Sequence, residues 1–264
     1  MTSEDEGLPD DEQPMTMVEH LAELRMRLMY SIVVMAIAVG ICFYYAEYIY
    51  QFLAQPLADA MSGMEEGRST NRLIYTNLTE PFFTYMKVSL WAGFFISFPF
   101  ISAQVWMYLA PALYKQEKRA FFPFLIFTPI LFVLGAAMAY YVVFPLAWDF
   151  FLSFERPMGA AGLAIQLEAK VNEYLSLVMK LILAFGICFE LPVLLTLLAK
   201  VGIVTSRGLA AKRKYAIVIT LLVAAFMTPP DLISQILLAI PVLILYEISI
   251  ILARIVEKKK LKDA

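Results

Sequence analysis

Six apolar segments, separated by charged stretches, constrain the fold of this 264-residue chain more than any other feature. A helix needs about 20 mostly apolar residues to cross a bilayer. The segments lie at about 28–50, 82–108, 122–144, 174–199, 215–227 and 232–253. Hydrophobic residues make up 61% of the chain, which leaves no room for a separate soluble domain. The sequence therefore predicts an all-α integral membrane protein with six transmembrane helices within residues 15–254.

Positive charge gathers in linkers and ends that all fall on one side of these segments. The residues are Arg25, Arg27, Lys115, Lys118, Arg119, Lys200, Arg207, Lys212, Arg213, Lys214, Arg254, Lys258, Lys259, Lys260 and Lys262. By the positive-inside rule this side is cytoplasmic, so both chain ends are expected in the cytoplasm. The acidic residues 1–14 and the basic residues 255–264 have the composition of solvated, disordered tails. The acidic start also argues against a cleaved signal peptide.

The fifth segment is shorter than a bilayer requires. About 13 helical residues measure about 20 Å, against an apolar core of about 30 Å. A short helix is accommodated by local thinning of the bilayer or by neighbouring protein. Prolines recur within or at the ends of the segments, at Pro99, Pro123, Pro129, Pro145, Pro192 and Pro241. They favour bent helices, and we expect a bundle that is concave on one side.

Glu190 lies in the middle of the fourth segment, where a carboxylate costs about 2.5–3.5 kcal/mol at the bilayer centre. No cation lies three or four residues away, and Pro192 bends the helix just beyond it. We therefore expect Glu190 to face a groove, a cavity or a partner. Lys180 lies in the same segment but nearer its outer end, and its long stem is expected to carry the ammonium group outward.

Three other carboxylates leave alternatives open. Glu23 is either an ordinary i,i+4 partner of Arg27 or part of a binding site. Glu117 has no cation at helical spacing, so it is either a solvated loop residue or available to an external cation. For Glu247, in the sixth segment, a helix–helix hydrogen bond is the simpler interpretation.

Several kinds of chemistry lack the residues they need. The single His20 excludes a site built from several histidines, and Cys42 and Cys188 fall in apolar segments, where cysteine behaves as a small hydrophobe. Nucleotide-binding and hydrolytic motifs are missing from the sequence. We therefore expect no metal, no cofactor, no nucleic-acid partner and no enzymatic activity.

Four motifs in order along the chain carry a resemblance to a known family. They are His20-Leu21-x-Glu23-Leu24-Arg25-x-Arg27-Leu28, Gln104-Val105-Trp106 through Ala110-Pro111-Ala112-Leu113-Tyr114-Lys115-x-Glu117, Phe185-Gly186-x-x-Phe189-Glu190-Leu191-Pro192, and Thr228-Pro229-Pro230-Asp231 with Ser234-Gln235. Together they closely resemble TatC, the polytopic subunit of the twin-arginine protein translocase. The resemblance extends from about Met15 to Arg254. Tyr108, where a Phe is familiar, and the intramembrane Lys180 depart from it.

The resemblance implies a function and a set of partners. TatC binds the paired arginines of signal peptides on folded cargo and, with the single-span subunits TatA and TatB, supports export driven by the proton-motive force. By this resemblance the chain lies in the cytoplasmic (inner) membrane and self-associates in a receptor complex. The alternative from another class is a proton-coupled transporter of a small solute, with Glu190 as the coupling site.

The resemblance also implies three groups of site residues. The signal-peptide site comprises Glu23 and Glu117, which receive the arginines, with Arg25, Arg27, Tyr108 and Arg119 beside them. The membrane groove comprises Glu190, Gln235 and Glu247. The outer-loop and partner contacts are Pro56, Pro81, Phe82 and Asp231.

Overall fold

The computed structural model describes residues 17–62, 72–113, 118–155, 167–227 and 232–263, and most of them are helical. In chain order the elements are α1 (Met17–Tyr44), α2 (Ala46–Ser62), α3 (Glu80–Leu113), α4 (Lys118–Met138), the π-helix η2 (Ala139–Val143), α5 (Phe144–Leu152), α6 (Val171–Phe189), α7 (Leu191–Val201), α8 (Ser206–Ala211), α9 (Arg213–Met227) and α10 (Leu232–Asp263).

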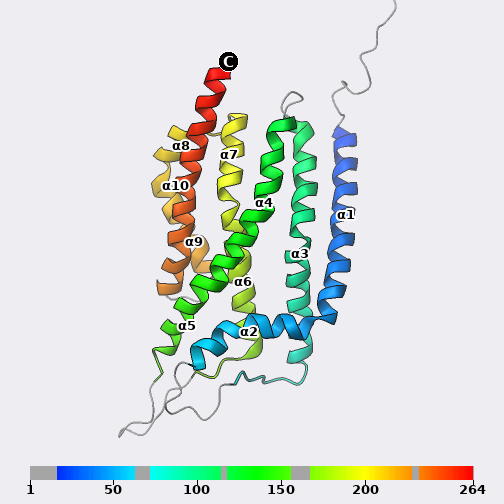
Figure 1. Cartoon of the computed structure of the whole chain (residues 1–264), viewed down its shortest axis with the longest axis vertical. Coiled ribbons are helices and arrows are strands. Elements are labelled where there is room, and N and C mark those ends of the chain that lie inside the picture. The colour runs from blue at the N-terminus through cyan, green and yellow to red at the C-terminus, as the bar shows by residue number, and fades with distance from the viewer. Residues whose placement is uncertain (1–16, 63–71, 114–117, 156–166, 228–231, 264) are drawn as a thin grey trace, which may run out of the picture.

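The predicted all-α architecture is present. The six apolar segments correspond to α1, α3, the run from α4 to α5, the run from α6 to α7, α9 and α10. Among the described residues, all of these except α9 are long and apolar enough to cross a membrane. Figure 1 shows that α1 begins and α10 ends at the same end of the molecule, which we call the terminal end. The opposite end, which carries residues 72–79 and 167–170, is the loop end.

The predicted end of the first segment, at about residue 50, is wrong. α1 starts at Met17 and ends at Tyr44, and the chain then turns into α2, which crosses the loop end (Figure 1). The sequence prediction treated most of residues 51–81 as a loop. α2 forms because Leu53, Leu57 and Met61 recur every four residues and are buried, which gives the helix one apolar face.

The predicted disorder of the basic tail is also wrong within the described residues. α10 continues through this tail to Asp263. No glycine or proline follows Pro241, and lysine and glutamate are good helix formers, so nothing ends the helix at the membrane surface.

The helices form an open row with two exposed edges. α1 packs mainly on α3, α3 on α4 and α6, α7 on α10, and α10 on α9. α1 and α9 therefore form the edges of the row. The main core lies toward the loop end, where Phe144, Leu152 and Leu175 are buried. There the Tyr174 hydroxyl donates a 2.8 Å hydrogen bond to the Leu53 carbonyl and so joins α6 to α2.

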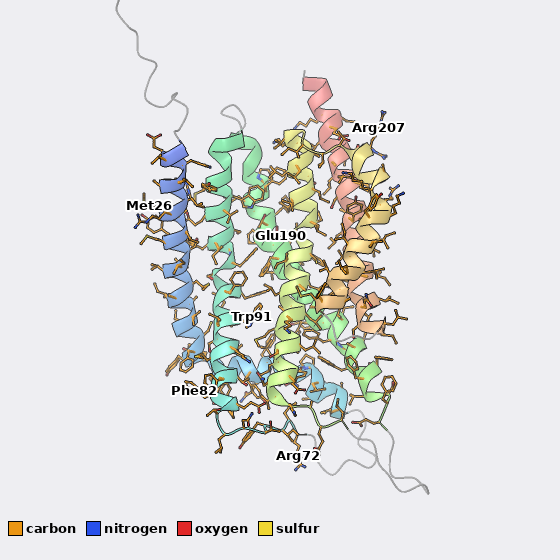
Figure 2. The ribbon with its side chains drawn as sticks, turned by 180° about the vertical axis from the view of Figure 1, so that it is seen from behind. Met26, Arg72, Phe82, Trp91, Glu190 and Arg207 are labelled. Carbon is orange, nitrogen blue, oxygen red and sulfur yellow. The ribbon has the colours of Figure 1, made fainter. Side chains whose placement is uncertain are left out.

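α9 is too short to cross a bilayer alone. Its 15 residues give a helix of about 22 Å, against an apolar core of about 30 Å. Figures 1 and 2 show that α9 and the start of α10 stop well short of the level that α3 and α6 reach at the loop end. A membrane that covers this edge of the molecule must therefore be thinner there.

Glycine permits the close contact between α4 and α6. A Cβ atom at Gly135 would lie 2.5 Å from the Phe185 carbonyl oxygen, which is backbone and cannot move aside easily. We expect Gly135→Ala to destabilise the protein by about 1–3 kcal/mol, the usual cost of overpacking. The measurement is the apparent melting temperature in detergent.

Gly40→Ala is the matched control for this variant. Nothing lies within 4 Å of a Cβ atom at Gly40, and alanine favours a helix over glycine by about 1 kcal/mol. The control should therefore melt no lower than the unsubstituted protein. A Gly135→Ala variant that melts with the control would show that α4 and α6 are not held this tightly.

Candidate functional site

The first predicted site lies between α1 and α3 near the terminal end. The Arg27 guanidinium donates two hydrogen bonds to Glu23 Oε1, from Nε at 2.9 Å and from Nη2 at 2.5 Å. Its Nη1 donates a third bond, of 3.3 Å, to Gln104 Oε1 on α3. The two charged side chains are only 23% and 22% exposed, so water screens this pair less than a surface pair. The expected i,i+4 pair is confirmed.

The second oxygen of the Glu23 carboxylate makes no described hydrogen bond. Glu23 Oε2 is buried and has no hydrogen-bond partner among the described residues. A carboxylate can accept about four hydrogen bonds, and a planar guanidinium matches both of its oxygens. Glu23 can therefore bind a further guanidinium if the side chains that bury Oε2 move aside.

An aromatic pair flanks Glu23 on the side toward the terminal end. The His20 and Tyr108 rings stack with their centroids 4.4 Å apart and their planes at 13°. This stack joins α1 to α3, with Tyr108 one turn beyond Gln104 on α3 and His20 about two turns before Arg27 on α1. It places the predicted site residue Tyr108 beside the helical turn that carries Glu23.

The other predicted members of the signal-peptide site are not all described. Arg25 is exposed on α1. Arg119 lies in the first turn of α4, but its side chain is not among those described. Glu117 lies outside the described residues, so its predicted role beside Glu23 stays a prediction.

Glu190 lies at a break in the fourth membrane segment. α6 ends at Phe189, α7 begins at Leu191, and Pro192 occupies the first turn of α7. The helix is therefore interrupted where the sequence predicts a bend. Figure 2 shows Glu190 at mid-height in the molecule, within the membrane-spanning region.

The Glu190 carboxyl group has few polar neighbours. Oε1 is buried and has no partner among the described residues. The Thr128 hydroxyl approaches the carboxyl group and also accepts a 3.0 Å hydrogen bond from Trp106 Nε1. Trp106, Thr128 and Glu190 thus form a short polar row across α3, α4 and α6–α7 inside an apolar layer.

The other two predicted groove residues lie on α10 and bond to α9. Glu247 forms an ion pair with Arg213, with contacts of 2.6 Å and 2.9 Å. The helix–helix hydrogen bond expected for Glu247 is therefore confirmed. Gln235 donates a 2.8 Å hydrogen bond to the Leu221 carbonyl. No described contact joins either residue to Glu190, and Asp231 lies outside the described residues.

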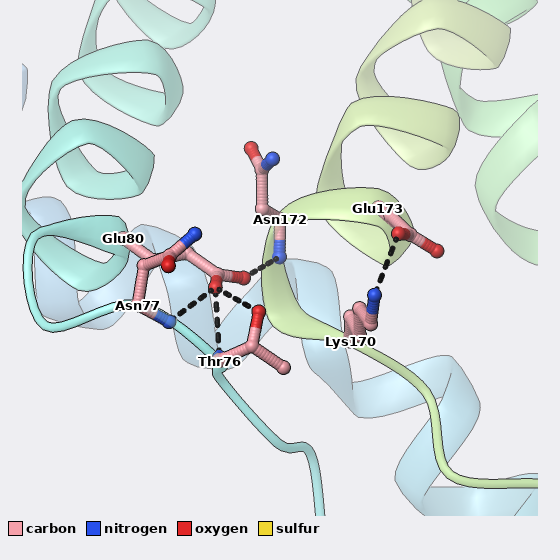
Figure 3. A network of polar contacts seen from close by, with 6 residues as sticks. All are labelled: Thr76, Asn77, Glu80, Lys170, Asn172 and Glu173. Atoms are coloured by element: carbon pink, nitrogen blue, oxygen red, sulfur yellow. Dashed lines mark hydrogen bonds and ion pairs between the residues drawn. The ribbon is translucent and has the colours of Figure 1, made fainter.

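The described outer-loop residues of the prediction lie in helices at the loop end, where hydrogen bonds to Glu80 form a polar clasp. Pro56 is buried in α2, whereas Pro81 and the exposed Phe82 lie in the first turn of α3. Figure 3 shows the Glu80 carboxylate between the segment 72–79 and the first turn of α6. It accepts hydrogen bonds from the backbone N–H groups of Thr76 at 2.9 Å, Asn77 at 3.4 Å and Asn172 at 3.3 Å.

A pair of backbone hydrogen bonds extends this clasp. Ile74 N–H donates to the Ala169 carbonyl at 3.1 Å, and Val171 N–H donates to the Ile74 carbonyl at 2.9 Å. The segments 72–79 and 167–170 are therefore held together next to the start of α3. This arrangement fixes where Pro81 and Phe82 lie.

Several of these residues were missed by the sequence analysis. Gln104, Thr128 and Arg213 matter only because the fold brings them to Glu23, Glu190 and Glu247 from other helices. For Gln104 the sequence does hold an indication, because an amide within an apolar segment often forms a hydrogen bond with a neighbouring helix. Within the described residues, no group of three or more His, Cys, Asp or Glu side chains is placed to hold a metal ion.

The sequence is similar to known proteins of one family. The family model described as Sec-independent protein translocase protein (TatC) matches residues 19–241. A protein of the same name from Magnetococcus marinus is 46% identical over 95% of this chain and 88% of its own length. The relative from Aquifex aeolicus is 44% identical, over 93% of this chain and 98% of its own length.

A solved structure resembles the fold as well. The crystal structure of a twin arginine translocase receptor, TatC, superposes with a TM-score of 0.77 at 44% identity. The match covers 90% of this chain and all of that one. The six-helix arrangement described above is therefore that of the crystal structure.

Proposed function

This chain belongs to the TatC family and is a multi-pass component of a Sec-independent protein translocase, and from that premise we propose that it is the receptor for twin-arginine signal peptides. The family is one of transport proteins, not of enzymes. The observation that carries the proposal is the partly buried Glu23 carboxylate, which has one oxygen bonded to Arg27 and the other without a partner among the residues that the structure describes.

The proposed orientation places the terminal end in the cytoplasm of the cell, at the inner membrane. The linkers and ends rich in lysine and arginine lie at this end, as the positive-inside rule requires of a cytoplasmic face. A signal peptide presented from the cytoplasm then meets Glu23 first, with Glu117 as the second carboxylate. Single-span TatA and TatB subunits and further copies of this chain complete the translocase.

Arg27 acts as an internal substitute for the incoming arginine. It holds Glu23 Oε1 while Glu23 Oε2 stays covered. A signal-peptide guanidinium that takes both oxygens must displace Arg27, whose other contact, to Gln104 at 3.3 Å, is long and weak. Lysine offers one mobile point charge in place of a planar fork and exchanges with Arg27 less well.

The two arginines cannot supply all of the affinity. Two charge-assisted contacts contribute about 3–6 kcal/mol, close to the 4.1 kcal/mol of a millimolar complex. The apolar part of the signal peptide supplies the rest, at about 0.8 kcal/mol for each buried CH₂ group. A cavity of about 360 Å³, lined by apolar residues that include Trp91, Phe95, Val133 and Met179, supports this step.

Binding of a fluorescent signal peptide to the purified protein in nanodiscs tests the proposal. We expect a peptide with Arg-Arg to bind about 5- to 150-fold more tightly than one with Lys-Lys, a difference of about 1–3 kcal/mol from the lost bidentate bonds. Equal binding of both peptides, with and without added TatB, would refute the receptor function.

Arg27→Gln tests the displacement step. An i,i+4 ion pair contributes about 0.3–0.5 kcal/mol, so its removal should tighten Arg-Arg peptide binding about twofold. Lys212→Gln removes an exposed positive charge between α8 and α9, breaks no described contact of Glu23 and lies outside the predicted site, so it serves as the control. If Arg27→Gln weakened binding more than the control did, Arg27 would contact the peptide instead of giving way to it.

A further inference from the structure

A cavity at the loop end contains the intramembrane lysine. It has a volume of about 670 Å³ and is bounded by residues of α2, α5, α6, α9 and the segment 167–170. Lys180 lines it from α6. Nine residues separate Lys180 from Val171, the first residue of α6, so the lysine lies about 14 Å into the helix.

The charges around this cavity are unequally matched. Lys170 pairs with Glu173 at 3.4 Å, and Glu168 pairs with Arg72 at 3.6 Å. Lys180 lines the same cavity, and the part of the chain that the structure describes offers it no ion pair. A buried donor adds to this imbalance, because the Trp148 indole N–H in the cavity wall has no acceptor among the described residues.

The apolar part of the cavity indicates an amphipathic occupant. Leu57, Leu177 and Phe151 line it below the polar rim that Lys170 and Asn172 contribute. A small inorganic anion would leave these apolar surfaces uncovered. A lipid would cover apolar surfaces of this kind with its acyl chains while its phosphate met the cationic part of the lining.

The short helix α9 brings headgroups to the depth of Lys180. Phe226 and Met227, at the end of α9, line the same cavity as Lys180. Beside α9 the apolar core of the bilayer is as thick as the apolar helix is long, because exposing an apolar helix to water or burying a charged headgroup in hydrocarbon is unfavourable. The headgroup layer at the loop end therefore dips to the level of Lys180.

From this juxtaposition we propose that the cavity binds the phosphate of an anionic phospholipid, with Lys180 as the cation that holds it. The ammonium group donates to the phosphate oxygens, and the indole of Trp148 is a second donor in the wall. The acyl chains run from the phosphate into the bilayer beside α9, against Phe226. Lys180 thereby anchors the thinned part of the membrane to the protein. This inference concerns the membrane at the loop end and does not rest on recognition of signal peptides.

Native mass spectrometry of the purified protein tests the site with phosphatidylglycerol as the probe and phosphatidylcholine as the neutral comparison. Lys180→Gln should bind phosphatidylglycerol about tenfold more weakly, which corresponds to 1.4 kcal/mol. Lys180→Arg should retain it. Lys87→Gln is the matched control, since Lys87 lies at the same end on α3 but bonds to Asn172 at 2.8 Å instead of lining this cavity.

Each outcome decides the proposal. Loss of the lipid in Lys180→Gln alone supports it, provided that the variant elutes as the unsubstituted protein does. Equal retention by Lys180→Gln, or equal loss by Lys87→Gln, refutes it. Displacement of the lipid by millimolar inorganic phosphate would show that the ligand is free phosphate and would also overturn the lipid assignment.

Discussion

Glu23→Gln is expected to weaken binding of a twin-arginine signal peptide about 10- to 150-fold. The variant keeps the size of the side chain and one carbonyl oxygen but loses the charge and the second acceptor. A hydrogen bond to a charged group contributes about 1.5–3 kcal/mol, and each 1.4 kcal/mol is a factor of ten. The measurement is a fluorescence titration in nanodiscs, with Arg-Arg and Lys-Lys peptides compared side by side.

The loss should be confined to the Arg-Arg peptide. Without the carboxylate the site no longer distinguishes the planar guanidinium of arginine from the ammonium group of lysine, so the two peptides should bind with similar affinity. Glu47→Gln removes an exposed carboxylate from α2 at the loop end and should change neither affinity. Unchanged Arg-Arg binding by Glu23→Gln would place the receptor carboxylate elsewhere in the chain.

The predictability of this site from sequence depends on how far apart its parts lie in the chain. The spacing of Glu23 and Arg27 predicted their pair, because residues four apart on a helix meet. The third member, Gln104, is 77 residues from Arg27, and only the packing of α1 on α3 brings them together. The local sequence pattern could therefore predict the Glu23–Arg27 pair but not the Arg27–Gln104 hydrogen bond.

The fold shows the same limit. Apolar length predicted the spans, and Pro192 predicted the break beside Glu190, since both follow from local chemistry. α2 was missed because polar residues and Pro56 interrupt its apolar residues, so it lacks the unbroken apolar run by which the membrane segments were recognised. The sequence could not show which residue bonds to Glu247. Its partner is Arg213 on α9, which confirms the helix–helix hydrogen bond.

Replacing Glu190 by leucine is expected to stabilise the protein and to abolish transport. Glu190 Oε1 is buried without a partner in the described part of the chain, and such a group costs about 1–3 kcal/mol, which leucine would recover. A carboxylate kept at this cost within a membrane segment is the mark of a functional residue. We expect export of a twin-arginine cargo to fall at least about tenfold, while the apparent melting temperature rises. Signal-peptide binding should stay within about twofold, because Glu23 lies on a different helix.

The matched control for this variant is Thr196→Val. Thr196 lies on α7 and its buried hydroxyl also lacks a partner among the described residues. Removal of that hydroxyl should raise the melting temperature similarly without loss of export, which separates stability from function. Loss of export in both variants would mean that rigidity of the α6–α7 run, and not the carboxylate, limits transport. If the protein alone took up a small solute in proteoliposomes, and Glu190→Leu abolished that uptake, the proton-coupled transporter would replace the receptor as the function of this chain.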